Sequence, residues 1–206
     1  MSIHFDRNQP SFRESRWILL EDVNVERLLD VFTSVDANAD KVWDACANFM
    51  THLNWHKPRH TVLRQKVENI PDDNRLKPKC LSQLAHVCYF TGKNVERKRC
   101  LDCALRLVRE RGDDACVGVV LRDLSDANRM LGLYEEGIQQ ARAGLEIYQR
   151  LGITMGQAAC SHYLAALLWQ EGELDAALEA ASHAIDLLPE EGEERGACRT
   201  QRLLGN

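Results

Sequence analysis

Residues 164–189, LAALLWQEGELDAALEAASHAIDLLP, carry the pattern that decides the fold. Their first residue, Leu164, has counterparts at Leu84, Leu124 and Leu204, each 40 residues from the next. Four further columns keep this register: Gly92, Gly132 and Gly172; Ala104, Gly144 and Ala184; Leu105, Leu145 and Ile185; Leu107, Ile147 and Leu187. Several columns that share one period predict an internal repeat.

Each 40-residue unit reads as two helices with a glycine between them. In the last unit, the apolar residues from Ala181 to Leu188 follow the i, i+3, i+4, i+7 spacing of one helix face. Gly172 suits the left-handed position that ends a helix, and Pro189 stops the second helix. The pattern predicts an all-α chain in which residues 79–206 form three hairpin repeats and an incomplete fourth.

The column Ala104, Gly144 and Ala184 holds only small residues. Glycine in a helix interior costs about 1 kcal/mol relative to alanine, so Gly144 needs a compensating reason. We expect that these positions let the two helices of a hairpin approach closely.

The repeat register weakens before residue 79, where His52 stands in place of the expected glycine. Amphipathic stripes persist in residues 23–78, and the weakest of them precedes Pro71. We expect a degenerate helical cap in this region. Residues 1–22 show little periodicity and are expected to be loose.

The residues Leu164, Ala165, Gly172, Ala177, Ala184 and Pro189 resemble a tetratricopeptide repeat (TPR). The period exceeds the roughly 34 residues of the simple repeat and is similar to the long-helix type found in kinesin light chains. This resemblance implies a right-handed α-solenoid. The other two units depart from the pattern, because Arg97 and Gly137 replace Ala177 and no proline follows the second helix.

Four runs resemble the carboxy-terminal repeat region of fungal NACHT or NB-ARC (NLR-type) proteins: HKPRHTVLRQKVENIPDD, RERGDD, LSDANRMLGLYEEGIQQA and AIDLLPEEGEE. The resemblance extends from about Val23 to the end and implies that a nucleotide-binding module belongs to the parent family. Gly92-Lys93-Asn94 lacks the hydroxyl residue and the preceding glycine of a phosphate-binding loop. Any NTPase activity therefore does not carry over to this chain.

Other patterns that could support chemistry are incomplete. They are a calcium-like run at Asp36, Asn38 and Asp40, a histidine series at His52, His56 and His60, and the pair Cys100 and Cys103. The calcium-like run lacks its glycine and bidentate glutamate, and the histidines lack further ligands. The cysteine pair falls within a packing helix. We expect no enzyme, no metal and no cofactor.

Composition places the chain among globular proteins. It has 206 residues, 45% hydrophobic and 28% charged, with a formal net charge of −5. No apolar run approaches the roughly 18 residues of a membrane span, and no export signal is evident. We therefore expect a cytoplasmic or nuclear protein whose eight cysteines stay reduced and mostly buried.

The resemblance implies that the first helix of each repeat lines a concave groove. Transferring that face by register predicts these groove residues: Lys79, His86, Tyr89, Arg122, Asp126, Arg129, His162, Trp169, Arg199 and Arg202. Arginine, histidine and large amphipathic side chains suit a peptide or protein partner with acidic and apolar residues. Alternatively, Tyr89 and Trp169 seal one repeat onto the next. Asp126 stands where chaperone-binding members need an asparagine, which disfavours chaperone tails as ligands.

Charge is unevenly distributed along the chain. Basic residues dominate residues 76–111, whereas residues 171–194 contain acids and no lysine or arginine. Two copies could therefore associate, basic end to acidic end, as a homo-oligomer. Nucleic-acid association through the basic cluster Lys93, Arg97, Lys98 and Arg99 is the alternative function. A membrane partner is not expected.

Overall fold

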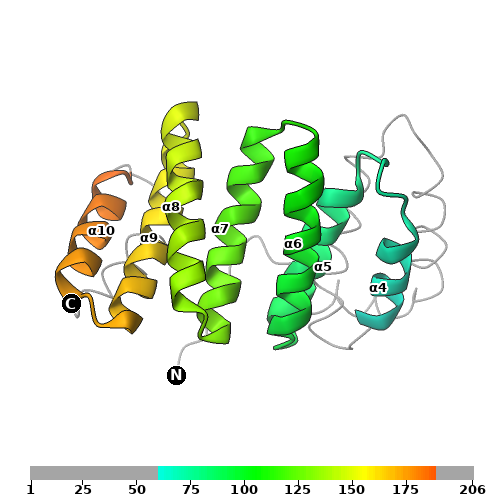
Figure 1. The fold of residues 1–206 in the computed structure, drawn as a ribbon, viewed down its shortest axis with the longest axis horizontal. Helices are drawn as coiled ribbons and strands as arrows, with labels where there is room; N and C mark the ends of the chain where they lie inside the picture. The colour runs from blue at the N-terminus through cyan, green and yellow to red at the C-terminus, as the bar shows by residue number, and fades with distance from the viewer. Residues whose placement is uncertain (1–59, 189–206) are drawn as a thin grey trace, which may run out of the picture. The chain divides into compact units, whose positions relative to one another are not determined.

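A computed structural model describes residues 60–188, and every regular element in that range is a helix (Figure 1). The helices are α4 (His60–Asn69), α5 (Lys77–Phe90), α6 (Asn94–Glu110), α7 (Asp114–Leu131), α8 (Tyr134–Leu151), α9 (Thr154–Glu171) and α10 (Leu174–Asp186). The all-α prediction is confirmed for this part of the chain. None of these helices has the length and apolar character needed to cross a bilayer. The chain divides into two compact units, Met1–Thr91 and Gly92–Asn206.

In the first unit, the Lys77 side chain caps the carboxyl end of α4. Its Nζ donates to the carbonyl oxygens of Val67 and Ile70, both at 2.6 Å, and of Glu68 at 3.1 Å. These carbonyls carry the negative end of the helix dipole, so a buried ammonium group stabilises them. The weak amphipathic stripe noted before Pro71 lies in the helix α4. The rest of the predicted amino-terminal regions, residues 1–22 and 23–59, lies outside the described residues.

In the second unit, α6 to α10 follow one another in space as they do in sequence (Figure 1). Each helix packs against the next, and α7 also packs against α9. The helices α7 and α9 are the first helices of successive hairpins, so the hairpins α7–α8 and α9–α10 stack as in a helical solenoid. The remaining predicted hairpin, α5 with α6, spans the boundary between the two units and stays a prediction.

The leucine column that defined the register forms part of the core. Leu84, Leu124 and Leu164 are 2%, 0% and 9% exposed. A second set of core residues joins α8, α9 and α10 through Ile138, Ala141, Leu164, Leu167, Leu168 and Ala177. The column Leu105, Leu145 and Ile185, which lies on the apolar stripe of the second helices, is only half-buried.

Glycines in the left-handed conformation end the helices at both turns of a repeat. Gly132 ends α7 with φ of 73° and Gly172 ends α9 with φ of 84°, as the repeat pattern predicted. Gly112 and Gly152 adopt the same conformation after the second helices, with φ of 67° and 68°. This second pair of glycines also has the 40-residue spacing of the repeat.

Close helix approach explains the small residues inside the repeats. A Cβ added at Gly144 would lie 3.0 Å from Cys160 Sγ of α9 and 3.7 Å from the Arg122 backbone nitrogen of α7. At Gly137, an added Cβ would lie 2.7 Å from Leu167 Cδ2 and 3.2 Å from the Ser125 carbonyl oxygen. The tightest contact at each glycine is therefore with α9 of the next hairpin, whereas the prediction for Gly144 concerned the two helices of one hairpin; within the hairpin, Gly137 lies closer to α7 than Gly144 does.

We expect Asp113→Ala to lower the free energy of unfolding by about 1 kcal/mol at neutral pH, because the Asp113 carboxylate caps α7. Its Oδ1 accepts the Cys116 backbone N–H at 3.0 Å, and this hydrogen bond lowers the pKa of Asp113 below its ordinary value. A lowered folded-state pKa stabilises the fold above about pH 4 and loses that effect as the pH falls through it. Urea unfolding across pH 3–7 measures the difference.

Asp113→Asn serves as the control, since asparagine caps helices without titrating near this range. It should retain most of the stability at pH 7. A deficit for Asp113→Ala that stays constant from pH 7 to pH 3 would contradict the capping role.

Candidate interaction face on α7 and α9

The predicted groove residues fall on both units and on residues outside the described range. Arg122, Asp126 and Arg129 lie on α7, and His162 and Trp169 lie on α9. Lys79, His86 and Tyr89 lie on α5 in the other unit. Arg199 and Arg202 lie outside the described residues.

The helices α7 and α9 occupy equivalent places in adjacent repeats and pack against each other. Residues at equivalent positions therefore point to the same side of the stack. We call this side the α7–α9 face; it comprises Val119, Arg122, Asp123, Asp126, Arg129 and Met130 of α7, and Ala159, His162, Tyr163, Ala166, Trp169 and Gln170 of α9.

Large apolar side chains are exposed on this face. Trp169 is 52% exposed, Met130 is 45% exposed and Val119 is 37% exposed. Trp169 is thus more than half exposed on α9. In the first unit, Tyr89 and Phe90 are 42% and 46% exposed and meet edge to face, with ring centroids 5.2 Å apart.

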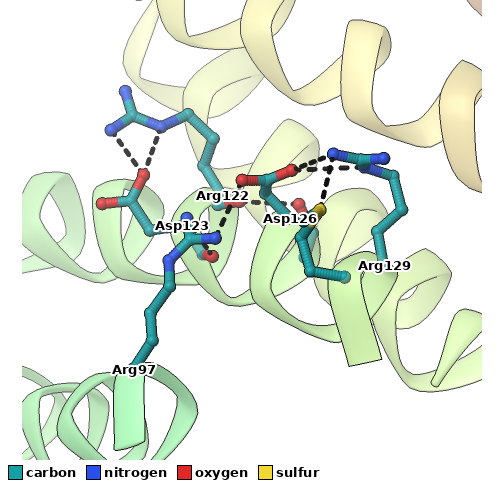
Figure 2. Close-up of polar contacts among 7 residues, drawn as sticks. Arg97, Arg122, Asp123, Asp126 and Arg129 are labelled. Carbon is teal, nitrogen blue, oxygen red and sulfur yellow. Dashed lines mark hydrogen bonds and ion pairs between the residues drawn. The ribbon is translucent and has the colours of Figure 1, made fainter. Parts of the chain in front are cut away.

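Arg122 is held by its neighbour on the same helix, Asp123. Its Nε and Nη2 donate to Asp123 Oδ1 at 2.9 Å and 2.7 Å (Figure 2). Burial acts to lower the pKa of Arg122, but the Asp123 charge and hydrogen bonds outweigh it and raise that pKa above its ordinary value. Asp123 was not predicted as a site residue, although its position beside Arg122 on one helix face could have suggested it.

Asp126, one of the predicted groove residues, is buried. Its side chain is 7% exposed, and its Oδ2 accepts from Arg97 Nη1 of α6 at 2.9 Å. Its Oδ1 accepts from Arg129 Nη2 at 2.8 Å and Nε at 3.2 Å (Figure 2). A carboxylate withdrawn from water needs such partners, because an uncompensated buried charge is strongly unfavourable.

These five residues, Arg97, Arg122, Asp123, Asp126 and Arg129, form what we call the Arg–Asp cluster. Arg97 and Asp126 are enclosed, whereas the Arg122, Asp123 and Arg129 side chains are 31%, 29% and 29% exposed. The cluster therefore presents two arginines and one aspartate at the α7–α9 face. Three arginines against two aspartates leave it with one net positive charge.

The basic cluster considered for nucleic acid is not a continuous cationic surface. Arg97 is 7% exposed and points to Asp126. Lys98 Nζ lies 3.3 Å from Asp102 Oδ2 and 3.5 Å from Glu136 Oε2. Only Lys93 and Arg99 of the four are exposed.

One serine–histidine pair was not anticipated from the sequence. Ser161 Oγ of α9 lies 2.9 Å from His183 Nδ1 of α10. Ser161 is 1% exposed, so this hydroxyl is closed to a substrate and joins two packed helices. Burial also raises the pKa of the Cys160 thiol to about 12, which keeps it protonated at neutral pH.

The six cysteines of residues 60–188 form no disulfide with one another. Cys80, Cys88 and Cys160 are buried, Cys100 and Cys103 are half-buried and Cys116 is exposed. The prediction of mostly buried thiols thus holds for three of these six. Cys100 and Cys103 lie within α6, where the spacing had placed them.

No family model and no curated protein matches the chain. Among solved structures, it is similar to the crystal structure of BtubC (BKLC) from P. vanneervenii, which is kinesin light chain-like with TPR-like helical repeats. The TM-score is 0.63 at 16% identity, over 94% of this chain and 80% of that one. This likeness concerns the fold: residues 60–188 are all-helical, in a TPR-like solenoid.

Proposed function

We propose that the chain is a non-catalytic scaffold that binds a protein or peptide segment on the α7–α9 face. The observation that carries this proposal is Trp169, a large amphipathic side chain that is 52% exposed on a face that also presents two arginines. Tryptophan and arginine contribute most of the binding energy in many protein interfaces. Stacked helical repeats use such surfaces for partners, which supports the proposal.

The chemistry of the face favours a partner with acidic and apolar side chains. Trp169 and Met130 offer apolar area, and the Arg–Asp cluster carries one net positive charge. We further propose that this array serves as the sensor or interaction arm of an NLR-type protein. The resemblance of residues 23–206 to the repeat region of fungal NLR-type proteins supports that role.

Trp169→Ala is expected to weaken peptide binding about tenfold or more, the effect of losing an interface anchor. An immobilised library of 15-residue peptides that vary in acidic and aromatic content provides the ligands. Fluorescence anisotropy of the strongest binder then measures Kd for each variant. Circular dichroism verifies that helicity is retained.

Leu178→Ala is the matched control. Leu178 is 55% exposed, similar to Trp169, but it lies on α10 outside the α7–α9 face. It should bind the peptide like the original protein. Equal losses for both variants, or none for Trp169→Ala, would rule out this face as the binding site.

Nucleic-acid association through Lys93 and Arg99 is the alternative, and a salt titration separates the two. Phosphate contacts release counterions, so affinity for an oligonucleotide falls steeply with salt. A peptide anchored by Trp169 should lose affinity only gently. Oligonucleotide binding whose affinity falls steeply with salt, and which Trp169→Ala leaves unchanged, would favour the nucleic-acid alternative.

A further inference from the structure

We propose that Arg97, a buried residue of α6, decides the charge preference of the α7–α9 face. Arg97 neutralises Asp126, so that Arg129 keeps its positive charge for an acidic side chain of the partner. This inference rests on the proposed function and assigns a specificity role to a buried residue.

The two partly exposed arginines, Arg122 and Arg129, differ in the carboxylates that they contact. Arg122 has its own carboxylate, Asp123, at 2.7 Å. Arg129 shares Asp126 with Arg97, whose side chain is 9% exposed and whose Nη1 lies 2.9 Å from Asp126 Oδ2. One carboxylate faces two guanidinium groups, so these three side chains sum to one positive charge, and of the two arginines it is Arg129 that reaches the surface.

The adjacent interface shows that the repeat packs without such a pair. The equivalents of Arg97 and Asp126, 40 residues later, are Gly137 and Ala166. Both are buried, and Gly137 sits against Leu167 of α9. Buried ion pairs contribute little stability relative to apolar residues of similar volume. Since the fold does not require Arg97 at this column, we assign its effect to the charge of the face.

The surroundings of Arg129 define the partner's chemistry. Nε and Nη2 of Arg129 donate to Asp126 Oδ1, which fixes the plane of the guanidinium group. Met130 Sδ lies 3.4 Å from Arg129 Nη2, and Met130 is 45% exposed. An oriented guanidinium group beside an exposed thioether suits a glutamate or aspartate flanked by an apolar residue.

Two pools of blocked nonapeptides test the inference. Both pools are random in Ala, Ser, Gly, Leu and Trp, but the central residue is Glu in one and Gln in the other. The amount of each pool retained by the immobilised full chain is measured at low salt. We expect the original protein to retain the Glu pool about three- to tenfold more than the Gln pool, the scale of one charge acting near a protein surface.

Three variants distinguish an effect of charge from a purely structural role of Arg97. Arg97→Met lowers the cluster to zero net charge and should lose the preference. Arg97→Ala/Asp126→Ala removes one charge of each sign and should keep it, whereas a purely structural role for Arg97 in holding Arg129 predicts a loss in both. Asp123→Asn, at a half-exposed position, should strengthen the preference and remains informative if Arg97→Met does not fold.

The outcomes separate this inference from the proposed function. Equal retention of both pools by the original protein overturns the inference and leaves peptide binding intact. Retention of neither pool overturns both. An unchanged preference in Arg97→Met, or a lost preference in Arg97→Ala/Asp126→Ala, overturns the role of Arg97 as the residue that sets the charge. An unchanged preference in Asp123→Asn overturns the net charge of the cluster as the cause of the preference.

Discussion

Leu124→Ala is expected to lower the free energy of unfolding by about 2–5 kcal/mol. Leu124 is 0% exposed on α7, the helix that packs against α6, α8 and α9. Removing three carbons there forfeits the transfer free energy and leaves a cavity, because the neighbouring backbones are already in close contact. Urea unfolding monitored by circular dichroism gives the transition midpoint and the slope, from which the change in the free energy of unfolding is obtained.

Leu145→Ala is the matched control for this substitution. Leu145 belongs to the same repeat and to an equally regular column, but it is only half-buried. Its loss should therefore cost clearly less than that of Leu124. A cost below about 0.5 kcal/mol for Leu124→Ala would mean that this column is not core.

The repeat columns show how far sequence alone reaches. Periodicity identifies residues that occupy one environment repeatedly, so Leu124, Leu164 and the glycines at 132 and 172 were predicted correctly. Periodicity does not tell how deeply each column is buried. The helix-face spacing of Leu145 fits the apolar stripe, yet the position lies at the edge of that stripe.

The Arg–Asp cluster could not be predicted, because it breaks the repeat. Arg97 departs from the small-residue column of Gly137 and Ala177, and this departure was visible as an anomaly without an explanation. Its partner Asp126 lies 29 residues away on another helix. A pair formed by two residues that do not recur in the other repeats leaves no periodic signal. Arg97 was therefore assigned to the basic cluster and Asp126 to the groove, although both side chains are buried.

Asp126→Ala is expected to lower the free energy of unfolding by about 3–5 kcal/mol, the usual cost of removing one partner of a buried ion pair. The Arg97 side chain, 9% exposed, would then lack the carboxylate that neutralises it. Arg97→Ala/Asp126→Ala should cost less, since it leaves neither member of the buried pair without its partner. Urea unfolding of Arg97→Ala, Asp126→Ala and the double variant completes a double-mutant cycle, which isolates the interaction free energy between the two side chains.

Asp123→Ala is the control. It removes a carboxylate that is 29% exposed on the same helix and should cost less than about 1 kcal/mol. A similarly small cost for Asp126→Ala, or a double variant less stable than either single one, would show that the pair is not a buried charge held by mutual neutralisation.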